Sequence, residues 1–133
     1  MKNRKMHSRI FIGIIFLFCT QLCVGQTIFG KWRTIDDETR KEKGIVEIYE
    51  ENGLVQAKIL QVLEKGREDA VCIKCKGELK GQPVKGMQII RNFKPAKNGE
   101  YKGSYLLDPE SGSVYRGKVW LDSDDKDKLK VRG

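Results

Sequence analysis

Histidine is almost absent from this sequence, and its scarcity limits the chemistry that the protein can support. The one histidine is His7, so residues 26–133 contain none. A serine nucleophile usually needs a histidine base, and Ser104, Ser111 and Ser113 have no such partner. No strand predicted below brings two carboxylates together by spacing alone. We therefore expect a protein that is not an enzyme.

The chain also lacks an apolar run long enough for a membrane helix, which needs about 20 residues. Its longest apolar run covers residues 10–18, with a basic segment before it and the small residues Val24 and Gly25 behind it. This order is typical of a cleaved secretory signal peptide over residues 1–25, with an uncleaved anchor as the alternative. We expect an exported protein, periplasmic or secreted, with no transmembrane anchor.

No charge of one sign dominates the remaining chain, residues 26–133. Four of the 26 lysines and arginines and none of the 18 acidic residues precede residue 26, so its net charge is +4 rather than +8. Charges of both signs are interspersed, which indicates a solvated surface and no nucleic-acid partner. Residues 26–133 are enough for a single domain with a modest core.

Short strands with alternating apolar residues fill this domain. Residues 45–51 and 54–63 flank Asn52-Gly53, a dipeptide that favours a tight hairpin turn. Alternation predicts three further faces, and their members are Met87, Ile89, Arg91 and Phe93; Tyr101, Gly103, Tyr105 and Leu107; and Tyr115, Gly117, Val119 and Leu121. Glycines within such faces indicate bends, bulges or close approaches.

A last strand is predicted over residues 128–132, and only residues 64–82 leave room for a short helical turn. Counting from Gly30, the pattern gives about seven strands. We therefore predict an all-β fold, a small antiparallel up-and-down barrel.

Several segments, in this order, resemble the DUF2147 family of small exported bacterial proteins of unknown function. They are Gly30-Lys31-Trp32-Arg33, Ile45-Val46-Glu47-Ile48-Tyr49, residues 72–75 followed by Gly77-Glu78-Leu79-Lys80-Gly81, Gly86-Met87, Leu107-Asp108-Pro109-Glu110-Ser111-Gly112 and Leu129-Lys130-Val131-Arg132-Gly133. The resemblance implies a calycin-type, lipocalin-like barrel over residues 26–133. It implies no activity, ligand or catalytic residue.

The chain departs from this family's pattern at its C-terminal end. The family continues for about one further strand beyond the positions of Arg132 and Gly133, where this sequence stops. We therefore expect a barrel that lacks its closing strand, either because the reading frame is truncated or because the barrel is open and a partner completes it. An unpaired edge invites pairing with a second chain or an envelope protein.

Gly30 and Trp32 are predicted to be structural residues. In lipocalin-like barrels, a tryptophan on the first strand plugs one end and stacks on a basic side chain near the last strand, for which Arg132 is a candidate here. Stacking of Trp32 on a ligand is the alternative.

Cys72 and Cys75 form a C-x-x-C motif, for which three chemistries come into question besides a plain disulfide. Haem attachment needs a histidine at position 76, which is Lys76. Zinc needs four ligands, so two chains would have to share it. Thiol redox activity would place the pair at a helix start after a strand, whereas this pair lies in a loop. We predict a local disulfide, with thiol redox as the alternative, and neither cofactor nor metal.

For function we expect a non-catalytic binding module for an apolar or amphipathic small molecule. The candidate ligand-binding residues on the inner face are Phe93, Tyr101, Tyr105 and Tyr115. The alternative is a structural or protein-interaction component of the cell envelope, whose barrel is filled by its own side chains.

Overall fold

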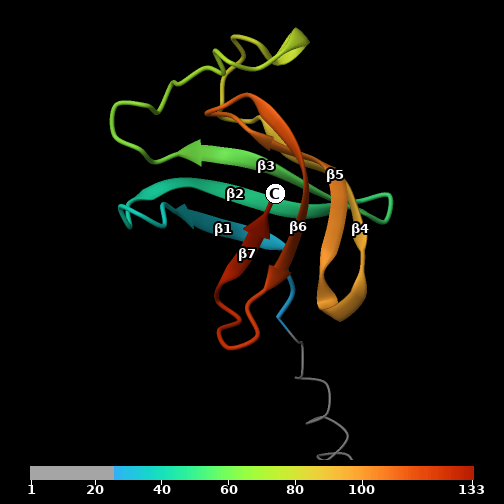
Figure 1. The fold of residues 1–133 in the computed structure, drawn as a ribbon. Coiled ribbons are helices and arrows are strands. Elements are labelled where there is room, and N and C mark those ends of the chain that lie inside the picture. Colours follow the sequence, from blue (N-terminus) through green and yellow to red (C-terminus); the bar gives the residue numbers. More distant parts are fainter. Residues whose placement is uncertain (1–25) are drawn as a thin grey trace, which may run out of the picture.

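The structure, a computed structural model, describes residues 26–133 as one antiparallel sheet that curves round on itself (Figure 1). The predicted signal peptide lies outside the described residues. Seven strands form the sheet, and they are β1 (Gly30–Ile35), β2 (Glu42–Glu51), β3 (Leu54–Val62), β4 (Gln88–Pro95), β5 (Tyr101–Asp108), β6 (Ser113–Leu121) and β7 (Leu129–Arg132). Two single 3₁₀ turns, η1 (Gly77–Leu79) and η2 (Lys97–Gly99), lie in the loops.

Each strand pairs with its neighbour in the chain, so the sheet order is β1-β2-β3-β4-β5-β6-β7. β1 and β7 are not hydrogen-bonded to each other, and the barrel is therefore nearly closed with an unsealed seam. This confirms the predicted small up-and-down barrel. The predicted hairpin between β2 and β3 is confirmed as well, because Asn52 and Gly53 both have the positive φ angles that its turn requires.

The main core fills the barrel from β2 round to β6. Ile48, Val55, Phe93 and Val119 are each at most 2% exposed and belong to one cluster. A second, smaller cluster forms where Met87 and Leu107 pack against the two cysteines. No helix in residues 26–133 is long and apolar enough to cross a membrane.

Two of the three predicted strand faces are wrong, because β-bulges reverse the alternation. The β3–β4 register shifts on both sides of Ala57, and Asn92 has a φ of 56°. As a result Ile90 and Phe93 enter the main core, while Met87 joins the second cluster. A bulge changes which residue points inward at the cost of one unpaired position.

The same happens on β5, where the register to β6 shifts between Gly103 and Leu106. Tyr101 and Leu106 pack on the main core, whereas Tyr105 and Leu107 belong to the second cluster. The third predicted face, on β6, is confirmed in its second half, where Val119 belongs to the main core and Leu121 packs against it, whereas Tyr115 is 45% exposed.

The glycines in these faces mark close approaches, as expected. A Cβ atom on Gly103 would overlap the ring of Phe93. A Cβ atom on Gly117 would lie 2.7 Å from Leu106 Cδ2. The side chains of neighbouring strands therefore occupy the space that these glycines leave.

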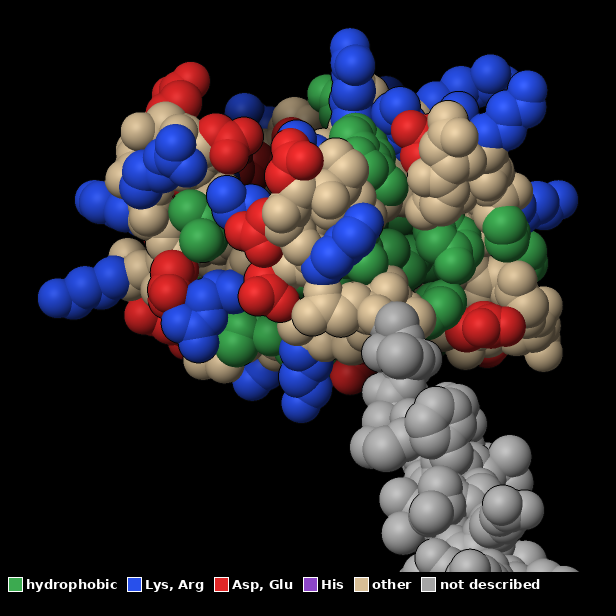
Figure 2. All heavy atoms as spheres, turned by 90° about the horizontal axis from the view of Figure 1, so that it is seen from below, with side chains coloured by type: hydrophobic (Ala, Val, Ile, Leu, Met, Phe, Trp, Pro, Cys, Tyr) green, Lys and Arg blue, Asp and Glu red, His purple; other side chains and the backbone are tan. Residues whose placement is uncertain are grey.

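The two ends of the barrel differ. At one, here called the closed end, Ile28 and Phe29 precede β1 and pack on the main core beside Trp32 and Tyr101. Seen from below, apolar side chains gather near the start of the described chain, among side chains of both charges (Figure 2). The other end, here called the mouth, carries the β1–β2 loop (36–41), the β3–β4 loop (63–87) and the β5–β6 turn (109–112).

Candidate binding site at the barrel mouth

The mouth contains two adjoining cavities. The inner cavity has a volume of about 420 Å³ and lies between β2, β3 and the β3–β4 loop. Its apolar wall consists of Val46, Ile59, Val62, Ala70, Val84 and Ile89. The outer cavity has a volume of about 590 Å³ and is lined mostly by charged side chains. Five residues border both cavities and are called the rim, namely Lys43, Glu64, Arg67, Pro109 and Glu110.

Irregular pairing at the ends of β1, β2 and β3 shapes the inner cavity. The β1–β2 register shifts between Thr34 and Ile35, and the β2–β3 register shifts between Ile45 and Val46. Gly44 is buried between them, and a Cβ atom there would lie 2.7 Å from the carbonyl oxygen of Gln61. A larger residue at position 44 would therefore push β2 and β3 apart at the cavity wall.

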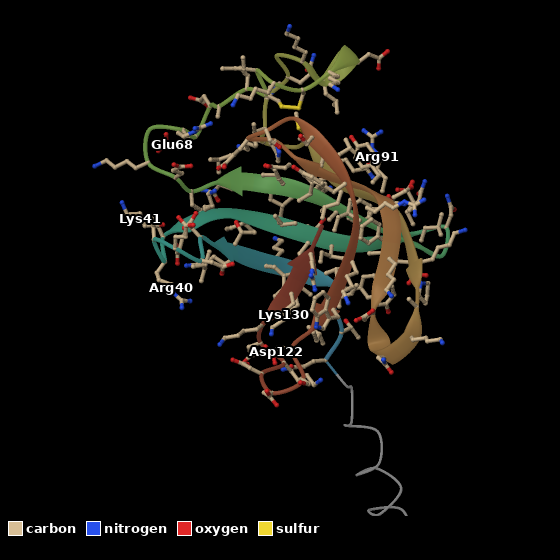
Figure 3. The ribbon with its side chains drawn as sticks, viewed as in Figure 1. Arg40, Lys41, Glu68, Arg91, Asp122 and Lys130 are labelled. Carbon is tan, nitrogen blue, oxygen red and sulfur yellow. A yellow bond between two sulfur atoms is a disulfide. The ribbon has the colours of Figure 1, made fainter. Side chains whose placement is uncertain are left out.

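One ion pair connects opposite sides of the rim. Lys43 Nζ on β2 donates to Glu110 Oε1 on the β5–β6 turn at 2.6 Å, and Asp36 Oδ2 lies 3.7 Å from the same nitrogen. The hydrogen bond to Glu110 raises the pKa of Lys43 above its ordinary value, so this amine is charged at neutral pH. A backbone N–H from Thr39 lowers the pKa of Asp36. Figure 3 shows Lys41 and Glu68, from the two neighbouring loops, on this side of the molecule.

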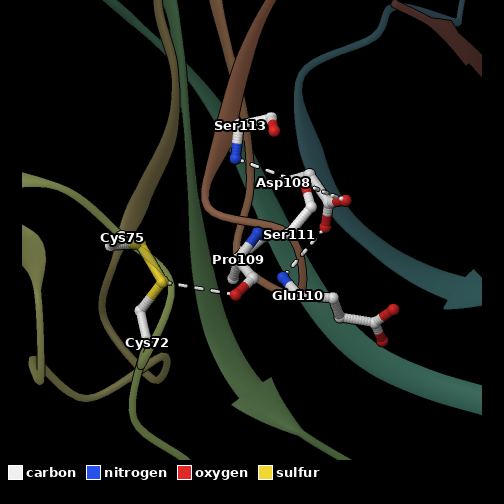
Figure 4. The surroundings of a disulfide bond; sticks show 7 residues. All are labelled: Cys72, Cys75, Asp108, Pro109, Glu110, Ser111 and Ser113. Carbon is white, nitrogen blue, oxygen red and sulfur yellow. Dashed lines mark hydrogen bonds between the residues drawn. A yellow bond between two sulfur atoms is a disulfide. The ribbon is translucent and has the colours of Figure 1, made fainter.

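Asp108 holds the turn that carries Glu110. Its Oδ1 accepts the N–H of Glu110 at 3.0 Å, and its Oδ2 accepts the hydroxyl of Ser111 at 2.8 Å (Figure 4). The carbonyl of Asp108 also accepts the N–H of Gly112 at 2.8 Å. These bonds close a tight turn of the kind that aspartate favours at its first position.

The disulfide predicted between Cys72 and Cys75 is confirmed, with Cα atoms 5.4 Å apart and both residues buried. Cys72 Sγ lies 3.2 Å from the carbonyl oxygen of Pro109. Because an oxidised sulfur has no proton to donate, this is a close S···O contact rather than a hydrogen bond.

Gly112 packs against the same disulfide loop. It has a φ of 71°, and a Cβ atom there would overlap the carbonyl of Lys74. The disulfide loop therefore supports the turn that carries Glu110. Within residues 26–133, no group of three or more histidine, cysteine or acidic side chains is placed to hold a metal ion.

The four predicted ligand-binding residues are not brought together. Phe93 is fully buried in the main core, and Tyr101 packs edge-on against Phe29 with ring centroids 6.2 Å apart at the closed end. Tyr105 lies under the guanidinium of Arg91, at 4.3 Å. Tyr115 is 45% exposed.

None of these four lines the inner or the outer cavity, and Tyr115 borders a separate, shallow cavity near the C-terminal residues Val131 and Gly133. No sequence pattern distinguishes the apolar residues that line the inner cavity from the other apolar residues of the chain. These residues line a cavity because the bulges and the long β3–β4 loop leave space beside them.

Gly30 begins β1, and Trp32 on the same strand packs on the main core. Trp32 Nε1–H donates to the carbonyl of Ile28 at 2.7 Å, and its ring packs on the main core. Gly30 has a φ of 125°, a conformation that side chains rarely adopt. The cation–π pairs of residues 26–133 involve Tyr49, Tyr105 and Trp120, so the predicted stacking of Arg132 on Trp32 is not formed.

Strand order, seam and cavity together define a lipocalin-like barrel that opens at one end. Comparison with solved structures agrees. The protein HP1028 from the human pathogen Helicobacter pylori, described as belonging to the lipocalin family, superimposes with a TM-score of 0.66 at 19% sequence identity. The match covers 80% of this chain and 71% of that one. At this identity the likeness concerns the fold alone.

Residues 30–133 match the family DUF2147, described as uncharacterized proteins conserved in bacteria, and the chain belongs to that family. This confirms the resemblance seen in the sequence. A search of curated proteins found no match.

Proposed function

We propose that this protein is an exported, non-catalytic binding module that holds an apolar or amphipathic small molecule in the inner cavity. The observation that carries the proposal is a cavity of about 420 Å³ with aliphatic walls below a charged rim. Binding sites for small molecules are commonly concave and mostly apolar, with a few polar groups at fixed positions. The rim residues Lys43, Glu64, Arg67 and Glu110 supply such groups here.

The burial of the cysteines supports a binding role over thiol chemistry. Cys72 is 0% and Cys75 is 3% exposed, so a partner thiol has no open path to either sulfur. Reactive disulfides are accessible or strained, and buried ones act as structural links.

The experiment is a titration with a fluorescent apolar probe, together with native mass spectrometry of protein purified without detergent. Val62→Trp places a large ring in the inner cavity and should abolish probe binding. Val114→Trp adds the same ring at an exposed position outside both cavities and should leave binding unchanged. Probe binding that survives Val62→Trp in a folded protein would refute the proposal.

The seam supports a second candidate, a structural or interaction protein of the cell envelope. Ile35 on β1 and Val131 on β7 are 53% and 50% exposed, and the facing edges of these two strands are unpaired with each other. Such edges accept a strand from another chain. Analytical ultracentrifugation and crosslinking at the seam test this candidate, which predicts an assembly that Val131→Lys disrupts and Val114→Lys, at an equally exposed position away from the seam, does not.

A further inference from the structure

The charged wall of the outer cavity is unevenly paired. Its cations are Lys41, Lys43, Arg67 and Lys74, and its carboxylates are Asp36, Glu42, Glu64 and Glu110. Glu42 forms an ion pair with Arg33 at 2.7 Å, and Lys43 forms ion pairs with both Asp36 and Glu110. Within residues 26–133, the ion pairs leave three of these cations and only Glu64 among the carboxylates without a partner. The four cations and four carboxylates sum to zero, and counting Arg33, which neutralises Glu42 from outside the wall, leaves one net positive charge.

Two of these cations also border the inner cavity. Lys43 and Arg67 belong to the rim, so each can reach a group at the boundary between the apolar and the charged space. Both come from elements beside the apolar wall, Lys43 from β2 and Arg67 from the β3–β4 loop. A molecule with its apolar part against Val46, Ile59 and Val62 would present its polar end to this pair.

The carboxylate now bound by Lys43 can be replaced. The side chains of Lys43 and Glu110 are 35% and 57% exposed, and exposed ion pairs contribute only about 0–1 kcal/mol. An arginine free of an ion pair adds a planar donor fork that matches a carboxylate or phosphate. An incoming oxyanion that binds Arg67 as well as Lys43 thus has the advantage over Glu110, which binds Lys43 alone.

We propose that the cavity is specific for amphiphiles with an oxyanion head group, carboxylate or phosphate. The head binds Arg67 and Lys43 and displaces Glu110, and the tail fills the inner cavity. This inference rests on the proposed function, and it adds the chemical class of the ligand. Glu110 acts as an internal competitor that occupies Lys43 when the cavity is empty.

The test is calorimetry with four probes of equal chain length below their micelle concentrations, namely dodecanoate, dodecyl phosphate, dodecanol and dodecyltrimethylammonium. The anionic probes should bind at least about tenfold more tightly than dodecanol, as expected for hydrogen bonds to charged groups. The ratio between dodecanoate and dodecyl phosphate separates a fatty-acid source from a phospholipid source. Tighter binding of the cationic probe would overturn the inference and point to Glu64.

Variants locate the head group. Arg67→Gln and Lys43→Gln should each weaken dodecanoate binding about tenfold without changing dodecanol binding. Glu110→Gln should strengthen dodecanoate binding severalfold, because the side chain that competes for Lys43 loses its charge. Lys85→Gln is the matched control, since Lys85 lies in the same β3–β4 loop and lines neither cavity.

The two proposals fail in distinguishable ways. Equal binding of dodecanol and dodecanoate, unaffected by the rim variants, would overturn the oxyanion inference and leave the proposed function standing. Absence of binding for all four probes would overturn both. A loss of dodecanoate binding in Glu110→Gln would overturn the competitor role of Glu110.

Discussion

The closed end and the mouth are built from the same seven strands and differ in what fills them. At the closed end, Phe93, Val55 and Val119 are fully enclosed, and Ile28 is buried with its carbonyl bound by the indole N–H of Trp32. At the mouth, Val62 and Ile89 are only partly covered and border open space. Apolar packing therefore dominates the closed end, whereas the mouth combines the smaller apolar cluster with charged side chains and a disulfide.

The difference teaches that a barrel this small can be packed with side chains in one part of its interior and enclose a cavity in another. Side chains occupy its interior near the β2–β3 and β4–β5 hairpins, and the inner cavity lies at the opposite end. Figure 3 also shows Asp122 and Lys130 together, far from the mouth, where they pair at 3.1 Å. Each end can therefore be perturbed separately.

The largest expected effect comes from Phe93→Ala. Removing a fully buried ring should lower the free energy of unfolding by about 3–5 kcal/mol, because the packed closed end cannot collapse around the space. Ile89→Ala, at the cavity wall, should cost about 2 kcal/mol, the low end for such a change, because one side of Ile89 already lacks contacts. Urea unfolding checks both. Equal losses would show that the two ends are packed alike.

Removing the disulfide should have an intermediate effect that is confined to the mouth. Cys72→Ala with Cys75→Ala should lower stability by about 2 kcal/mol on the chain-entropy model. Amide exchange measured by mass spectrometry should rise in residues 63–87 and in the β5–β6 turn, which contacts the disulfide loop through Pro109 and Gly112. Faster exchange around Trp32 would contradict the separation of the two ends.

Trp32→Phe tests the closed end with a smaller change. The carbonyl of Ile28 loses its hydrogen bond from the indole N–H, and we expect a loss of about 1 kcal/mol in urea unfolding. Trp120→Phe is the control, because Trp120 stacks on Lys118 and its indole makes no hydrogen bond among residues 26–133. A larger loss for Trp120→Phe would refute the structural role of Trp32.

The smallest effect is a dependence of stability on pH at the closed end. Lys118 donates to Glu100 at 2.9 Å and holds the pKa of that carboxyl below its ordinary value of 4.5, with Lys102 contributing as well. This contribution is present above about pH 4.5 and is lost as the pH falls through the folded-state pKa.

The difference in unfolding midpoint between wild type and Glu100→Gln should therefore shrink between pH 6 and pH 3. Glu51→Gln is the control, since Glu51 forms no ion pair within the described chain. A difference that grows as the solution is acidified would contradict the assigned pair.

Much of the fold could be predicted from local patterns. Strand alternation and turn residues such as Asn52-Gly53 give the number and order of the strands, since a hairpin turn is specified by the residues within it. The Cys72–Cys75 pair could also be predicted, because three residues of separation bring the two cysteines within reach of each other. The cavity could not, since its walls come from segments far apart in the sequence.

The sequence by itself determined an all-β barrel of seven short strands, its turns and its local disulfide, because these depend on neighbouring residues. Only the tertiary structure decided which aromatic residues point inward. Bulges at Asn92 and beyond Gly103 depend on how strands pair across the sheet, and each reverses the faces that follow it. The Lys43–Glu110 pair across the mouth likewise joins residues 67 positions apart, which no local pattern connects.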